Sequence, residues 1–508
     1  MTKNTGILLG IIVLKFVLQY ALVSPIYDLH RDEYLHLDQG SHLAWGYVSV
    51  PPFTSWVAFM VKCLGSGVFW VRFFPALFGV LTIVVVWKTI GALGGHWLAS
   101  ALGAICVLFS SLLRLNILFQ PNSFDVLCWT AFYYIVIRYI QSEDKKWLYA
   151  GAVIFALGFL NKYNFVLLLL GLLPAILLTK HRKIFVCRSF YFAVALGALL
   201  ILPNLLWQYQ NDFPVFHHLK LLEQTQLVHV DRMDFLVDQL LFFIGAFVVL
   251  VSSIVGLILY PPFKSYRIFA WSMLFTLAIF MFFKAKSYYA IGIYPIYIAF
   301  GSVYLTRALS WGWKRYLLPI AFAVPVLLFI PISRVAFPNK DPNEIVRNPQ
   351  EYQDYGLLRW EDGKDHLLPQ DFADMLGWKE LAQKVDAIYN QLPNRNQTLI
   401  LCDNYGQAGA INYYSKNKDV RAVSFNADYL DWFLVDTKIE NLVRVKEVEG
   451  STDEMETTSP FFATARLADS IANPLAREYR TAIFVFSQPK IDIRQRLREE
   501  IATEKSER

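Results

Sequence analysis

Cysteine is scarce in this sequence, and its spacing excludes several kinds of site. The five cysteines lie far apart, so their spacing matches neither a zinc site nor a redox pair. A disulfide between Cys63 and Cys402 is kept as an alternative. The sequence also lacks a basic block. Its formal net charge is +6, but Lys and Arg are spread over many loops, which argues against a nucleic-acid-binding protein.

Long apolar runs dominate the first two thirds of the chain. Among the 508 residues, 56% are hydrophobic and 16% are aromatic, which is more than the core of a soluble domain needs. The first run, TGILLGIIVLKFVLQYALV, lacks a small-residue cleavage site and is expected to remain as a signal anchor. Because each run is long enough to cross about 30 Å of hydrocarbon, we predict about eleven transmembrane helices. They are expected near residues 6–27, 68–90, 96–113, 122–140, 147–161, 164–179, 189–208, 235–260, 267–283, 288–306 and 315–333.

The loop cations predict an orientation for these helices. If Lys3 is cytoplasmic, one side of the membrane receives most of the loop cations, as the positive-inside rule requires. These cations are Lys88, Arg138, Lys145, Lys146, Lys180, Arg182, Lys183, Arg188, Lys264, Arg267, Arg307, Lys314 and Arg315. The stretch after the first helix, the loop after Trp207 and the tail after Arg334 are then expected on the outer face.

The tail differs in character from the rest of the chain. After a polar segment rich in Pro and Asn, the stretches TLILCDNYGQAGAINYYS and TAIFVFSQPK are typical of short buried strands beside helices. The expected fold is therefore a polytopic α-helical membrane protein with a small C-terminal α/β domain on the outer face. We expect a transmembrane catalytic domain over residues 1–333 and a soluble domain over residues 334–508.

Ionisable side chains gather at the outer ends of several predicted helices. Such groups are costly at membrane depth, so they indicate a function or a water-filled cavity. Lysines at the hydrocarbon boundary suit a lipid phosphate whose tail stays in the bilayer, and a nearby carboxylate suits removal of a proton from a hydroxyl. The ionisable residues are Arg31, Asp32, Glu33, Asp125, Lys162, Lys284 and Lys286, and the neutral Asn122 accompanies Asp125.

A second outer segment follows Trp207 and carries His217 and His218 on a predicted amphipathic interfacial helix. Its aromatic and polar residues suit either a sugar-binding groove or a headgroup-level belt.

Structural interpretations stay open for each candidate. The carboxylates are also explained by a salt bridge to Arg31, the lysines by snorkelling, and Asn122 and Asp125 by helix capping. A divalent metal is a further alternative, with Glu33, His36, Asp38 and His42 as ligands, but their spacing matches no familiar metal site. No cofactor is expected.

Several motifs follow one another along the chain in a familiar order. They are RDEYLHLDQGSHLAWGYVSVPPF, QPNSFDVLCW, GFLNKYN, LPNLLWQYQNDFP, KAKSYYAIGIYPIYIAFG and, in the tail, NYGQAGAINYY. In these motifs the sequence resembles the GT-C glycosyltransferases, specifically the group of protein O-mannosyltransferases and aminoarabinose transferases that use polyprenyl-phosphate sugars.

The resemblance implies a lipid-phosphate sugar donor, an active site on the outer face of a bacterial inner membrane, and an acidic base in the first outer loop. That base is Asp32, with Glu33 as its neighbour or substitute. Donor-phosphate binding falls on Lys162, Lys284, Lys286 and Arg31, and substrate binding on Asn122, Asp125, Tyr163, Tyr288, Tyr289, His217 and His218. Asn122 stands where some relatives have an acid. The expected reaction is a single displacement with inversion onto a glycan, lipid or protein acceptor.

Two other functions remain as alternatives. A transporter or flippase would place charges through the membrane midplane and show repeated halves with broken helices. Here the charges cluster at one face and no repeated halves are evident. A binding or scaffold protein with an inactive pocket is the third possibility.

Overall fold

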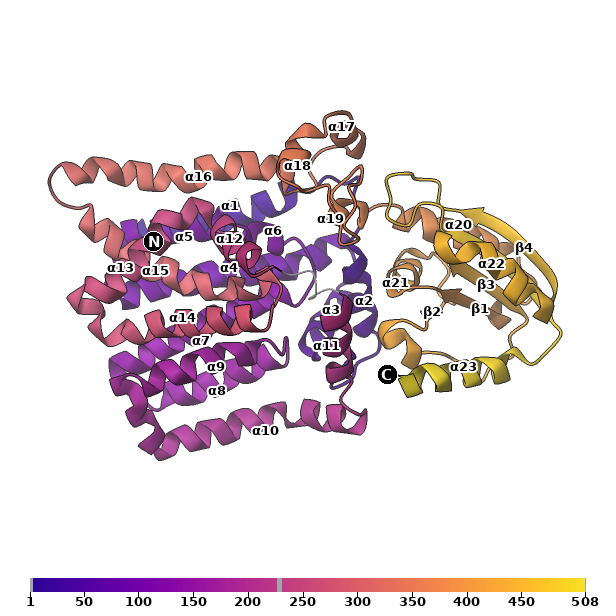
Figure 1. Cartoon of the computed structure of the whole chain (residues 1–508), viewed down its shortest axis with the longest axis horizontal. Helices are drawn as coiled ribbons and strands as arrows, with labels where there is room; N and C mark the ends of the chain where they lie inside the picture. Colours follow the sequence, from indigo (N-terminus) through magenta and orange to yellow (C-terminus); the bar gives the residue numbers. More distant parts are fainter. Residues whose placement is uncertain (1–2, 226–230, 508) are drawn as a thin grey trace.

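The computed structural model describes residues 3–225 and 231–507, and it combines a large helical part with a smaller domain built on one β-sheet (Figure 1). A helix begins close to the start of nearly every predicted span. The long helices are α1 (Lys3–Ala21), α4 (Val68–Ala92), α5 (Trp97–Leu108), α7 (Asn122–Ser142), α8 (Lys146–Phe159), α9 (Phe165–Leu177), α10 (Arg188–Gln210), α13 (Phe247–Leu259), α14 (Arg267–Phe282), α15 (Tyr294–Ala308) and α16 (Leu318–Val335).

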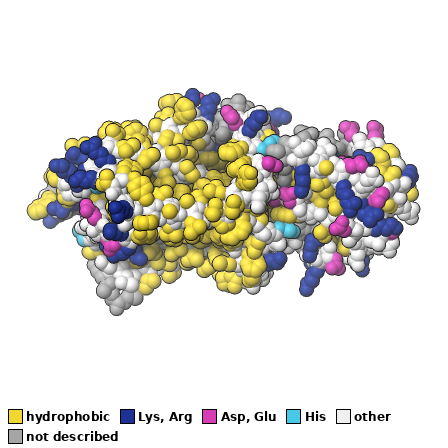
Figure 2. All heavy atoms as spheres, turned by 90° about the horizontal axis from the view of Figure 1, so that it is seen from below, with side chains coloured by type: hydrophobic (Ala, Val, Ile, Leu, Met, Phe, Trp, Pro, Cys, Tyr) yellow, Lys and Arg dark blue, Asp and Glu magenta, His cyan; other side chains and the backbone are white. Residues whose placement is uncertain are grey.

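The described residues contain six helices long and apolar enough to cross a membrane, or up to eight if two bent pairs each count as one span. The count of about eleven therefore stays a prediction. In the view of Figure 2, hydrophobic side chains cover most of the helical part, and Lys and Arg side chains lie at its end away from the C-terminal domain and on that domain itself. That distribution is the one expected from the loop cations, and the orientation itself also stays a prediction.

One predicted span is interrupted. Instead of a continuous helix over residues 235–260, α12 (Arg232–Leu241) is followed by the short 3-10 helix η3 (Ile244–Ala246) and then by α13, with a bend of 68°. At the break, a Cβ on Gly245 would lie 2.9 Å from the backbone of Pro325 in α16. The close approach of α16 therefore requires glycine at this position.

Shorter helical elements connect the long ones. They are α6 (Leu112–Leu115), α11 (Pro214–Thr225), η1 (Lys180–Val186), η4 (Pro261–Tyr266), η5 (Ser287–Ile293) and η6 (Gly312–Leu317).

The stretch after α1 was expected to be an outer loop, but much of it is helical. It forms α2 (Arg31–Gln39) and α3 (Phe53–Cys63). The start of α2 is a capping box: His30 Nδ1 accepts a hydrogen bond from the Asp32 amide at 3.2 Å, and Glu33 accepts one from the His30 amide at 2.6 Å. These bonds satisfy amides that have no partner within the helix, so this polar segment forms a defined helix at the edge of the apolar part.

The C-terminal domain contains a five-stranded sheet in the order β2-β1-β3-β5-β4. The first three strands run parallel, and β5 is antiparallel to both β3 and β4. Strands β1 and β5 occupy the two segments where strands were expected. The strands are β1 (Thr398–Cys402), β2 (Ala422–Ser424), β3 (Asn441–Lys446), β4 (Phe462–Ser470) and β5 (Ala482–Pro489).

Helices surround this sheet and connect it to α16. They are α17 (Pro342–Arg347), α18 (Gln350–Asp354), α19 (Gln370–Ala373), α20 (Trp378–Gln391), α21 (Tyr405–Tyr414), α22 (Val448–Thr458) and α23 (Ile493–Glu507), with the short 3-10 helices η7 (Arg395–Gln397), η8 (Ala427–Asp431) and η9 (Ser459–Phe461).

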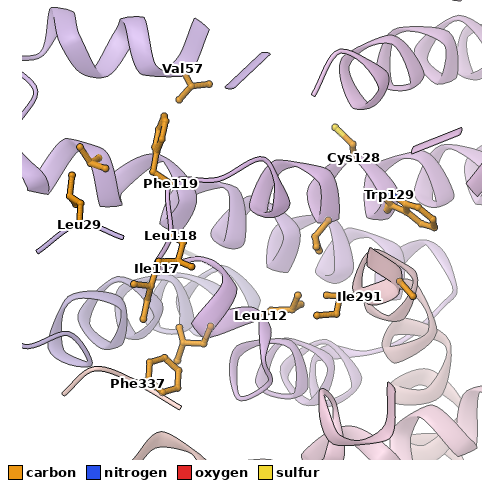
Figure 3. Close-up of a cluster of buried hydrophobic side chains, with 14 of the residues drawn as sticks. Leu29, Val57, Leu112, Ile117, Leu118, Phe119, Cys128, Trp129, Ile291 and Phe337 are labelled. Atoms are coloured by element: carbon orange, nitrogen blue, oxygen red, sulfur yellow. The ribbon is translucent and has the colours of Figure 1, made fainter. Parts of the chain in front are cut away.

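Helix α2 lies between the helical part and the sheet domain and packs against α21 (Figure 1). One buried apolar cluster includes Tyr34 of α2, Trp378 of α20 and Ile411 of α21. The rings of Tyr34 and Trp378 meet edge to face with centroids 5.7 Å apart. Because the cluster continues across the junction, the two parts share a core, and the boundary at residue 334 stays a prediction. Figure 3 shows buried residues of the helical side, including Val57, Leu118, Phe119, Ile291 and Phe337.

Candidate active site

Asp32 lies in the first turn of α2, with its carboxylate held from two directions. Its Oδ1 accepts a hydrogen bond from the Tyr405 hydroxyl at 2.6 Å, and its Oδ2 accepts one from the Gln120 side-chain amide at 3.1 Å. The side chain keeps 40% of its surface exposed. A carboxylate has about four lone-pair sites, so Asp32 retains the capacity to accept a further proton or hydrogen bond.

The surroundings of Asp32 favour its ionised form. Burial opposes ionisation, but His30, the Tyr405 hydrogen bond and Arg31 together hold the pKa of Asp32 below its ordinary value. A carboxylate in this state is ionised at neutral pH, as a general base must be.

A chain of hydrogen bonds connects Asp32 to Lys162. Gln120 donates to Asp32, and its side-chain oxygen accepts from the Asn122 amide at 3.0 Å. Asn122 Oδ1 in turn accepts from Lys162 Nζ at 2.6 Å. The structure therefore brings together an acid from α2, the first residue of α7 and a lysine from the loop between α8 and α9.

Lys162 lies against two aromatic rings from a fourth segment. Its Nζ is 4.2 Å from the ring centroid of Tyr289 and 5.2 Å from that of Tyr288, both at the start of η5. Such rings attract a cation electrostatically. Burial lowers the pKa of Lys162 to about 8, an effect that nearby Lys286 reinforces and Asp125 opposes. The ammonium form therefore predominates at neutral pH.

The charge of Lys286 acts on Lys162 and on His218 of α11. Its Nζ also lies 3.8 Å from a carboxylate oxygen of Glu361. Burial, His217 and Lys286 lower the pKa of His218. Lys284, by contrast, occupies the left-handed region at the end of α14, with φ at 49°.

Glu33 and Arg31 serve other parts of the molecule. Glu33 is fully buried, and its two oxygens accept from the backbone amides of His30 and Phe119 at 2.6 and 2.7 Å. Arg31 faces the C-terminal domain, where its guanidinium stacks 4.7 Å from the Tyr405 ring centroid. Neither side chain joins the chain of hydrogen bonds between Asp32 and Lys162. The base role of Asp32, with Glu33 as its neighbour or substitute, stays a prediction.

Asp125 and Tyr163 flank the group. Asp125 accepts from the Trp129 indole at 3.1 Å and from the Asn164 amide at 3.3 Å. The Tyr163 hydroxyl bonds Asn204 and Gln208 of α10 at 3.2 and 2.8 Å. These bonds fix the segments around Lys162 relative to α7 and α10. The substrate-binding roles of all these residues stay predictions.

The residues weighed as metal ligands are engaged elsewhere. Asp38 accepts from Asn412 at 2.8 Å and from Tyr429 at 2.6 Å, and the His42 ring stacks on Trp432. In the part of the chain that the structure describes, no three His, Cys, Asp or Glu side chains are arranged to hold a metal ion. Cys63 and Cys402 are both free thiols, so the possible disulfide between them is not formed.

Two residues at the centre of the arrangement had no role in the sequence analysis. Gln120 and Tyr405 both lie inside quoted motifs, QPNSFDVLCW and NYGQAGAINYY. Neither side chain ionises near neutral pH, so a search for charged groups passes over them. Only the folded chain shows that both reach Asp32.

Parts of the sequence are similar to known proteins. The family model described as dolichyl-phosphate-mannose-protein mannosyltransferase matches residues 49–207. The lipid A galacturonosyltransferase RgtD of Rhizobium johnstonii is 26% identical over 196 residues, which is 38% of this chain. The match spans only 41% of that relative's own length.

Solved structures extend the likeness to nearly the whole chain. ArnT from Cupriavidus metallidurans shares the fold in its apo form (TM-score 0.63, 13% identity) and when bound to undecaprenyl phosphate (TM-score 0.61, 14% identity). Each comparison covers 95% of this chain and 98% of ArnT. The predicted resemblance to the GT-C group is confirmed. Both sequence matches are to glycosyltransferases by name, and each covers less than half of this chain.

Proposed function

We propose that this protein is a membrane glycosyltransferase that moves a sugar from a polyprenyl-phosphate donor to an acceptor hydroxyl at the outer face of the membrane. The observation that supports this most is the chain of hydrogen bonds from Asp32 through Gln120 and Asn122 to Lys162. It links a carboxylate and an ammonium group within one small group of residues, and a displacement at a lipid-linked sugar needs both kinds of group close together.

The basic half of the site, which consists of Lys162 and Lys286, suits the donor. Lys162 and Lys286 would bind the phosphate, and the apolar surface of the helical part would hold the polyprenyl tail. One solved structure of similar fold contains undecaprenyl phosphate, which supports a donor of this class. A preorganised cationic site contributes several kcal/mol to barrier reduction when negative charge develops on the leaving phosphate.

The acidic half of the site, which contains the Asp32 carboxylate, suits the acceptor. Asp32 removes the proton from the acceptor hydroxyl while its oxygen forms a bond to the anomeric carbon. The bond from that carbon to the phosphate oxygen breaks, and polyprenyl phosphate leaves with its charge beside the lysines. One displacement inverts the anomeric configuration.

The acceptor is the less defined substrate. The name of the galacturonosyltransferase relative suggests a uronic acid as the sugar and lipid A as the acceptor. A glycan or a protein is the further class. We place the enzyme in a bacterial inner membrane, with the C-terminal domain on the outer side.

The direct experiment uses purified full-length protein in lipid nanodiscs with radiolabelled undecaprenyl-phosphate sugars, including a galacturonosyl donor, and lipid A, glycan or peptide acceptors. We expect transfer, or slow donor hydrolysis when the acceptor is wrong. Asp32→Asn protein is the matched control. Binding or transport of donors without cleavage of the sugar–phosphate bond would contradict the proposal. Since no metal is proposed, EDTA should leave the rate unchanged.

A further inference from the structure

The C-terminal domain reaches the proposed base through one side chain. Tyr405, the first residue of α21, donates its hydroxyl proton to Asp32 Oδ1 at 2.6 Å. Burial and the neighbouring Asp32 charge raise the pKa of Tyr405, so the phenol stays protonated and remains a donor. The hydrogen bond joins a neutral donor to a carboxylate, which makes it stronger than a bond between two neutral groups.

The local sequence is suited to this contact. A Cβ on Gly406 would lie 2.6 Å from Arg31 Cγ, and a Cβ on Gly409 would lie 2.6 Å from Tyr34 Cβ. Glycine at both positions therefore lets α21 approach α2 closely. Asn404 caps α21 by accepting from the Gln407 amide at 3.0 Å.

A buried network fixes the start of α21 from behind. Asn404 donates to Glu447 at 2.6 Å and to Glu478 at 3.1 Å. Gln407 donates to the other oxygen of Glu478 at 2.6 Å. Since Glu478 is only 5% exposed, these bonds hold the first turn of α21 in one position.

Other ionisable groups also act on Asp32. His30, Arg31 and His36 belong to its own segment, and the Asp32 charge also acts on Tyr288 of η5. Asp371 and Asp374 lie 3.9 and 3.7 Å from His30 Nε2. In the described part of the chain, Tyr405 is the ionisable side chain that donates a hydrogen bond directly to the carboxylate.

From these contacts we propose that the C-terminal domain completes the active site by supplying Tyr405, a positioning residue that orients the Asp32 carboxylate and keeps it ionised. The inference rests on the proposed function, in which Asp32 is the catalytic base. The domain is then part of the catalytic machinery as well as a candidate for acceptor selection.

The test measures the ionisation of Asp32 itself. Infrared difference spectra of the full-length protein in nanodiscs, recorded from pH 3 to 7, follow the carbonyl band of the protonated acid, which is assigned by its loss in Asp32→Asn. Tyr405→Phe removes one hydroxyl. We expect the Asp32 midpoint to rise by about one pH unit, because a hydrogen bond to the charged form of an acid lowers its pKa. The acid limb of the transfer rate should move in the same direction, with the donor KM unchanged.

Tyr413→Phe is the matched control. It lies on the same helix, and its hydroxyl donates to the Ser66 carbonyl at 2.6 Å. Its spectrum should show the wild-type midpoint. An unchanged midpoint in folded Tyr405→Phe protein, or an equal shift in both variants, would overturn the inference. Because the spectra need no turnover, absence of transfer by the wild type would instead count against the proposed function.

Discussion

The C-terminal domain supports the acidic half of the site together with the helical part, whereas the helical part alone holds Lys162 in the basic half. Asp32 is held by Tyr405 of the C-terminal domain and by Gln120, whereas Lys162 is held by Asn122 and the rings of η5. The sheet domain thus contributes, through Tyr405, to the half assigned to the acceptor, and the helical part contributes to both halves. Changes in the two halves should therefore affect the use of the donor and the acceptor differently.

The largest effect is expected at the base. Asp32→Asn keeps the size of the side chain but cannot take a proton, so transfer should fall about 10²- to 10⁴-fold. Donor affinity should stay near the wild-type value, as measured by binding of a radiolabelled polyprenyl phosphate. Turnover close to wild type would remove Asp32 from the base role.

Lys162→Ala should mainly affect the donor half. We expect kcat/KM for the donor to fall about 10²-fold, since one preorganised group at a developing charge typically contributes that much. The KM for the acceptor should change little. Steady-state rates measured over a range of donor and acceptor concentrations check this difference. An equal loss of kcat/KM for donor and acceptor would indicate a structural lysine.

Glu33 provides a contrast with its neighbour Asp32. Glu33→Gln places a side-chain amide where two backbone amides now donate, so one of those donors loses its acceptor. The free energy of unfolding should fall by about 1–3 kcal/mol. Thermal unfolding in nanodiscs measures the loss, and the folded fraction should retain its specific activity. A stable but inactive variant would instead give Glu33 a catalytic role.

The pH dependence of donor binding should follow Lys162. Because burial lowers its pKa to about 8, its positive charge is present below that pH and is lost above it. Donor affinity should therefore decline as the pH rises through about 8. Titrations from pH 6.5 to 9.5 with wild-type and Lys162→Arg protein test this, since arginine stays charged throughout. The same decline in both proteins would assign it to another group.

The smallest effect is expected at the exposed ion pair between Glu361 and Lys286. Glu361 lies 3.8 Å from Lys286 and has 62% of its side chain exposed. Glu361→Gln should free Lys286 for the phosphate and raise donor affinity by less than about fivefold, since exposed ion pairs contribute about 0.2–1 kcal/mol. Weaker donor binding by this variant would show that the pair supports the site.

Much of the fold could be predicted from the sequence. Apolar runs locate the long helices because span length and hydropathy are local properties. The break between α12 and α13 lies where Gly245 meets Pro325, a contact between distant residues that no local pattern contains. Helix α2 was missed because its stability comes from capping bonds and from packing against α21.

The site was predictable in its charged members and less so in its neutral ones. Asp32 and Lys162 stand out because charge is costly at a membrane boundary. Gln120 and Tyr405 do not stand out, since their importance comes from the partners that folding brings to them. Adjacent carboxylates can also differ in their surroundings. Both oxygens of Glu33 accept hydrogen bonds from backbone amides, whereas the Asp32 side chain stays partly exposed.

The most direct test of the two-half arrangement is a structure of the protein in nanodiscs with a non-hydrolysable polyprenyl-phosphate sugar. The account predicts the phosphate within hydrogen-bonding distance of Lys162 Nζ, with the anomeric carbon facing the side of Asp32. A phosphate bound away from Lys162, or a sugar pointing away from Asp32, would contradict it.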